Sequence, residues 1–97
     1  MARLEVRLEA ELDALEAALW YEGERGGLGS EFLDELRATF TRVEQAPLQF
    51  PVVSRSLRRA ILRRFPFGVF FTLEGEEATV MAIMHLHRDR KEWQRRG

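Results

Sequence analysis

The residues of this chain that could do chemistry lie together at the end of one apolar segment. His85, His87 and Arg88 directly follow the run that ends at Met84. Two histidines could act as an acid–base pair because imidazole titrates near neutral pH. An arginine could hold a phosphate through two parallel hydrogen bonds, so the set would suit cleavage of a phosphodiester. The alternative is that both rings cover apolar surface at a strand end and that Arg88 pairs with Asp89.

The same His-x-His spacing could contribute to a metal site. Such a site needs further ligands, and the sequence offers no third one at useful spacing and no cysteine. We therefore expect neither a metal ion nor a cofactor.

A second candidate site is the arginine-rich segment 55–64, which contains five arginines in ten residues. Guanidinium groups bind phosphates, but they also pair with acidic segments of another protein. Because the net charge of the chain is −1, direct binding to nucleic acid is disfavoured. A tryptophan within the basic C-terminal segment either folds back on the sheet, which we favour, or meets a partner. The candidate partner-binding residues are Arg58, Arg59, Arg63, Arg64 and Trp93.

Charge is distributed unevenly between the two parts of the chain. Residues 1–54 hold five arginines against eleven acidic residues, a balance of −6, whereas residues 55–97 hold ten basic residues against five acidic ones, a balance of +5. Such asymmetry is typical of a protein with a charged partner, although solvated helices and strands would also produce it. No N-terminal signal peptide or bilayer-spanning run is recognisable, so we expect a cytoplasmic protein that does not bind membranes.

Two helices are predicted near the N-terminus, after a strand over residues 3–8. Leu12, Leu15 and Leu19 recur at three- and four-residue spacing, which predicts a helix over about 9–24 whose apolar face packs on a sheet. A glycine cluster at 26–29 then joins this helix to a second one, which ends before Pro47. Trp20 and Tyr21 are predicted to pack in the core or in the helical hairpin.

Three strands are predicted after an irregular connector over 47–53. They cover about 56–64, 67–74 and 78–86, and an acidic turn containing Gly75 joins the last two. Strict alternation along the last strand would place His85 and His87 on one face with Met81 and Ile83. Residues 88–96 are predicted to form a last helical turn or a mobile tail. The result is an α+β fold of one domain, 1–97, in which a helical hairpin covers one face of a small sheet and leaves its arginine-lined face free.

These elements together resemble the RelE/ParE superfamily of bacterial toxins, and ParE-type members most of all. The resemblance rests on residues distributed along nearly the whole chain and on their order. They are Ala18-Leu19-Trp20-Tyr21-Glu22, Gly27-Leu28-Gly29 with Phe32-Leu33, Leu62-Arg63-Arg64-Phe65-Pro66-Phe67, Val69-Phe70-Phe71, and His85-Leu86-His87-Arg88-Asp89 with Trp93.

The resemblance implies the toxin of a type II toxin–antitoxin pair, neutralised by a cognate antitoxin. ParE-like members inhibit DNA gyrase by protein–protein contact, whereas RelE-like members cleave mRNA on the ribosome without a metal. The lysine–tyrosine set of many RelE-like members is missing, because the only lysine is Lys91 and the only tyrosine is Tyr21. A ParE-like inhibitor is therefore the favoured prediction. The alternatives are an endonuclease that uses His85, His87 and Arg88, or an inactive interaction module.

Overall fold

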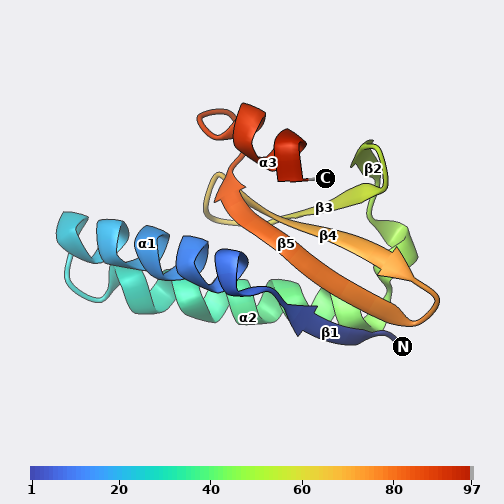
Figure 1. Cartoon of the computed structure of the whole chain (residues 1–97). Coiled ribbons are helices and arrows are strands. Elements are labelled where there is room, and N and C mark those ends of the chain that lie inside the picture. Colours follow the sequence, from blue (N-terminus) through green and yellow to red (C-terminus); the bar gives the residue numbers. More distant parts are fainter. Residues whose placement is uncertain (97) are drawn as a thin grey trace.

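The computed structural model of the chain describes residues 1–96 and shows a mixed sheet with helices on both faces (Figure 1). The α+β fold predicted from the sequence is confirmed. In chain order the elements are β1 (Arg3–Val6), α1 (Leu8–Glu24), α2 (Leu28–Gln45), the 3₁₀ helix η1 (Pro47–Gln49), β2 (Val52–Ser54), β3 (Leu57–Ile61), β4 (Phe67–Glu74), β5 (Glu77–His85) and α3 (Arg90–Arg96).

The sheet has five strands in the order β1-β5-β4-β3-β2. Strand β1 lies parallel to β5, and the other neighbouring strands are antiparallel. The sequence predicted four strands, because β2 falls in the proline-containing connector that was expected to be irregular. A tight turn joins β2 to β3, and Arg55 adopts a left-handed backbone conformation there, with φ of 53°. Along the described part of the chain, no helix is long and apolar enough to cross a bilayer.

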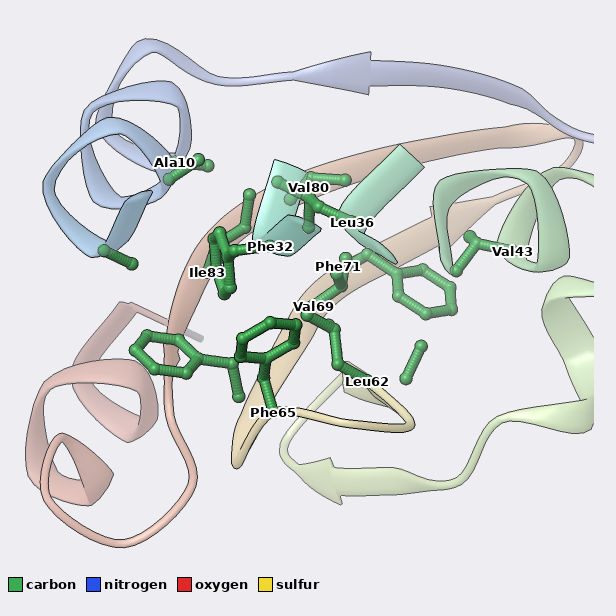
Figure 2. Close-up of a cluster of buried hydrophobic side chains, with 14 of the residues drawn as sticks. Ala10, Phe32, Leu36, Val43, Leu62, Phe65, Val69, Phe71, Val80 and Ile83 are labelled. Atoms are coloured by element: carbon green, nitrogen blue, oxygen red, sulfur yellow. The ribbon is translucent and has the colours of Figure 1, made fainter. Parts of the chain in front are cut away.

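The main core lies between the sheet and the helical hairpin α1–α2. Helix α2 buries Phe32, Leu36 and Val43 against the face of the sheet that carries Val69 and Val80 (Figure 2). A fully buried Leu or Phe side chain stabilises the fold by about 1.5–3 kcal/mol relative to an exposed one, so this stripe holds α2 in place.

Helix α1 buries the face opposite to the predicted one. Its buried residues are alanines, Ala10, Ala14, Ala17 and Ala18, while Leu12, Leu15 and Leu19 are 54–64% exposed. Small side chains allow the helix to approach its neighbours closely, and this close approach turns the leucines outward. The expectation that the leucine face packs on the sheet is therefore wrong.

A β-bulge in β5 also overturns the predicted strand faces. Phe70 pairs with Ala82 and Phe71 with Val80, so Met81 is the extra residue. An extra residue reverses the alternation beyond it. Ile83 therefore belongs to the hairpin-side core with Val80, whereas Met81 packs with Met84 on the other face.

The far face of the sheet is partly covered by α3. Trp93 is 3% exposed and packs with Leu57, Phe70, Ala82 and Met84 in a second, smaller core. Figure 1 shows α3 on the side of the sheet opposite α1 and α2. The expectation that the chain leaves this face free is thus wrong where α3 lies.

Candidate partner-binding surfaces

His85 holds together the turn that follows β5. Its Nδ1 atom accepts hydrogen bonds from the backbone N–H groups of His87, at 3.2 Å, and Arg88, at 3.1 Å. Its own backbone N–H donates to Asp89 Oδ2 at 3.0 Å, and its ring lies edge-on to Phe67 with centroids 5.6 Å apart. Since Nδ1 accepts in this arrangement, the neutral ring carries its proton on Nε2.

The charge state of His85 follows from these surroundings. Burial lowers its pKa below the usual value, and the positive charge of Arg88 lowers it further against the opposing effect of Asp89. At neutral pH the imidazole is therefore neutral. This fits its role as a hydrogen-bond acceptor in the turn and does not suit a general acid.

His87 and Arg88 lie beside His85 on the surface of the same turn. Both are exposed, and the rings of the two histidines are 6.2 Å apart between centroids, which is too far for a direct proton transfer. Within residues 1–96, no group of three or more His, Asp or Glu side chains is placed to hold a metal ion.

Tyr21 approaches this end of the sheet, although the sequence placed it only in core or hairpin packing. Its ring packs on Phe32, Phe65 and Phe67, as predicted for a core residue, with centroid distances of 5.4, 4.8 and 5.9 Å. Burial raises the pKa of its hydroxyl, and the charge of Arg88 opposes that rise. Tyr21 and His85 thus contact the same Phe67 ring from α1 and β5. Tyr21 and His85 are brought together only by the packing of α1 against β4 and β5, so no local sequence pattern predicts that they are neighbours.

The arginines of β3 point to opposite faces of the sheet. Arg58 pairs with Phe71 in register, lies on the hairpin side and donates to the backbone oxygen of Phe50 at 2.7 Å. Arg59 pairs with Phe70 on the α3 side, where its Nε atom is buried without a hydrogen-bond partner among the described residues. These two guanidinium groups therefore do not form one surface.

Arg63 and Arg64 lie beyond the end of β3, in the loop to β4. The backbone N–H of Arg63 donates to Glu35 Oε2 at 2.5 Å. The Arg64 side chain pairs with Glu35 at 3.3 Å and with Glu31 at 3.4 Å. Both side chains are exposed, so this loop offers cationic groups to a partner beside α2. The predicted extension of the strand to residue 64 is wrong.

Trp93 is placed against the sheet and not at the surface. Its ring stacks on Phe70, with centroids 4.4 Å apart and planes inclined by 18°. Arg96 anchors the same helix through an ion pair to Asp13 of α1 at 2.6 Å. While α3 stays docked, Trp93 is inaccessible to a partner.

The comparisons with known proteins bear on the fold. No family model matches the chain, and no curated protein matches its sequence. Among solved structures, it is similar to a chain of the chromosomal ParDE TA system from P. aeruginosa, with a TM-score of 0.67 and 21% identity. The match covers 88% of this chain and 96% of the other.

The chain therefore shares its fold with that chain of the ParDE TA system. At 21% identity the likeness concerns the arrangement of elements. The roles of Arg59, Trp93 and His85 in this fold therefore follow from their own contacts: a partly buried cation, a side chain that covers the sheet and a hydrogen-bond acceptor in a turn.

Proposed function

We propose that this chain is the toxin of a type II toxin–antitoxin pair, that an antitoxin neutralises it, and that it inhibits DNA gyrase by protein–protein contact. The observation that supports this proposal is the fold shared with a component of the ParDE toxin–antitoxin system over 88% of the chain. The proposed toxin occupies the whole chain as one domain, 1–97.

The hydrogen bonds and the pKa of His85 at the end of β5 favour inhibition by protein–protein contact over catalysis. His85 Nδ1 is already occupied by two backbone donors, and its lowered pKa keeps the ring neutral. The sequence supplies only one lysine, Lys91, to neutralise a phosphorane. A general acid is therefore poorly provided at the end of β5, although Arg88 lies beside His85.

In this proposal the exposed arginines of the β3–β4 loop contribute to binding of the antitoxin. Arg63 has an exposed side chain, and Arg64 is held in place by two carboxylates of α2. Rim charges of this kind increase the rate of association and its dependence on salt more than they increase affinity. Charge reversal at Arg63 is expected to slow antitoxin association, whereas reversal at Arg58 would disturb a bond within the fold.

A second candidate function is metal-independent mRNA cleavage on the ribosome, and one observation favours it. Tyr21 and His85 contact the same Phe67 ring, and Arg88 acts electrostatically on both of their side chains. Such a cluster could hold a phosphate and supply a protonated tyrosine hydroxyl.

Two reactions with the purified protein separate these candidates. One is supercoiling of relaxed plasmid by DNA gyrase, and the other is synthesis of a reporter in a cell-free translation extract. Inhibited supercoiling with intact mRNA is the expected result. Codon-linked mRNA cuts that disappear in His87→Ala would instead establish cleavage, and inactivity in both reactions would contradict both functions.

A further inference from the structure

The outward face of α1 carries a continuous row of exposed leucines. Leu8, Leu12, Leu15 and Leu19 are 67%, 56%, 54% and 64% exposed. They are spaced by four, three and four residues, which is the spacing of a coiled-coil seam. We call these four residues the α1 leucine stripe. A row of large apolar side chains on one surface marks a site of protein interaction, because isolated exposed leucines are common but contiguous patches are not.

The stripe is flanked by a pocket on one side and by a groove on the other. On the β5 side an open pocket of about 270 Å³ is lined by Asp13, Glu16, Trp20, Arg88 and Asp89 together with apolar core residues. On the α2 side a shallow groove is lined by Leu15, Leu33 and Phe40. Trp20 is 54% exposed, so the apolar surface continues from the stripe into the pocket.

The charged residues that border the stripe determine which charge a docking partner must carry. Helix α1 contains six acidic residues and no basic one. Heptad spacing puts Glu9 and Glu16 along one border and Glu11 along the other, while Glu22 takes the next position of the stripe itself. Glu11 and Glu16 have no ion-pair partner in residues 1–96, whereas Glu22 accepts hydrogen bonds from the N–H groups of Gly27 and Gly29.

A second copy of the chain fits this surface poorly. If two α1 helices met along their stripes, glutamates would face glutamates in both the parallel and the antiparallel orientation. Like charges across such a seam are repulsive and direct pairing toward a different partner. The complementary partner is a helix with the same apolar spacing whose borders carry lysine or arginine.

We propose that the α1 leucine stripe is the docking surface for a basic amphipathic helix of a second polypeptide. The apolar side chains of that helix interdigitate with the four leucines, and a lysine or arginine at its border enters the pocket beside Trp20, where Glu16 and Asp89 face it. Taking this second polypeptide to be the antitoxin rests on the proposed function, whereas the chemistry of the docked helix does not.

The test uses two synthetic helical peptides of three heptads with leucine at positions a and d. One carries lysine at positions e and g, which also prevents it from pairing with itself, and the other carries glutamate there. Binding to the full chain is followed by fluorescence anisotropy of labelled peptide and by the emission of Trp20. We expect the lysine peptide to bind, its affinity to fall with added salt, and its binding to shift the Trp20 emission to shorter wavelength.

Variants of the stripe provide the matched comparison. Leu12→Ser with Leu15→Ser is expected to weaken binding of the lysine peptide by about tenfold or more, since central apolar contacts dominate such interfaces. Leu48→Ser changes an equally apolar residue, 73% exposed in η1 and outside the stripe, and should leave the affinity unchanged. Because all three side chains are exposed, circular dichroism should show an unchanged fold.

Three outcomes would overturn the proposal. The first is equal binding, or no binding, of the lysine and glutamate peptides. The second is an unchanged affinity in the double variant. The third is a concentration-dependent dimer of the wild type in sedimentation that the double variant loses, which would make a second copy the occupant. None of these readouts depends on gyrase or on translation, so failure of the proposed function and failure of this inference are separable.

Discussion

At the scale of single residues, His85 has two properties that keep its ring neutral and occupied within the turn. Its ring nitrogen accepts two backbone N–H groups, and burial with the nearby Arg88 lowers its pKa. Both features favour the neutral ring, so protonation would break the turn. The histidine pair was visible in the sequence, but the bulge at Met81 and the bonds within the turn were not, because neither leaves a local pattern.

The stability of the fold should therefore depend on pH through His85. Because its pKa in the folded state is below the reference value of 6.5, the unfolded chain binds the proton first. As far as His85 is concerned, the free energy of unfolding is expected to be constant at pH values well above the reference pKa. It is expected to fall as pH drops through the window between the unfolded and folded pKa values of His85. Urea denaturation at a series of pH values measures this dependence.

His85→Asn should flatten the dependence in that window, since an amide oxygen can accept the same N–H groups but does not titrate. His87→Asn is the control, because this exposed ring accepts no hydrogen bond within the described residues, and its replacement should retain the dependence. A slope that persists in His85→Asn would contradict the assignment.

Glu35 is the residue that holds the β3–β4 loop to α2. Burial works against its charge, but the hydrogen bonds from the Arg63 backbone and from Arg64 outweigh burial, so its pKa lies below the usual value. Its stabilising effect is present above the reference pKa of a free glutamate and is lost as pH falls through the folded value.

Replacing this carboxylate should loosen the loop. Glu35→Gln is expected to lower the free energy of unfolding by about 1.5–3 kcal/mol, the range for hydrogen bonds to charged groups. In the Glu35→Gln background, Arg64→Ala should add little, because its main partner is gone. Asp34→Asn breaks only an exposed pair with Arg37 and should have little effect. Chemical denaturation of these variants and of Arg64→Ala alone would show additive losses if the coupling were absent.

At the scale of elements, the helices were predictable because glycine and proline mark their ends. The break at Gly26–Gly29 and the stop before Pro47 match the ends of α1 and α2. Which face of α1 is buried was not predictable in the same way. Its leucines and its alanines both recur at helical spacing, and choosing between them requires knowing how closely α2 approaches.

That close approach depends on Gly29. A Cβ atom at this position would lie 2.5 Å from the backbone oxygen of Ala18. Gly29→Ala is therefore expected to push the hairpin apart and to destabilise the fold by about 1–3 kcal/mol. Gly23→Ala is the matched control, because nothing lies within 4 Å of its added Cβ and the position is helical.

Since alanine is the better helix former, Gly23→Ala should raise stability by up to about 1 kcal/mol. Thermal unfolding of the two variants should thus move in opposite directions. Equal shifts would mean that helix propensity alone, and not the contact of α2 with Ala18, decides the outcome at Gly29.

At the scale of the whole molecule, the chain is built in three layers, with the acidic hairpin on one side of the sheet and the basic α3 on the other (Figure 1). The acidic residues of α1 and the basic residues of α3 therefore lie on opposite sides of the sheet, whereas Arg63 and Arg64 of the basic segment lie beside α2. The ion pair of Arg96 with Asp13 joins these oppositely charged layers at one edge. The sequence predicted the sheet, the hairpin and the return of Trp93 to the sheet, and the stacking of Trp93 on Phe70 shows how α3 forms the third layer.

The two tryptophans allow this third layer to be tested in solution. Trp93→Ala should remove the stack on Phe70 and lower the free energy of unfolding by about 3–5 kcal/mol, the usual loss for a buried aromatic residue. Trp20→Ala removes a side chain that is 54% exposed on the hairpin, so its effect should stay within about 0.5 kcal/mol. Hydrogen exchange at β4 and β5 should quicken only in Trp93→Ala, because α3 would no longer cover Phe70 and Ala82. If both variants melted like the wild type, α3 would not be docked in solution, and the far face of the sheet would be open to a partner after all.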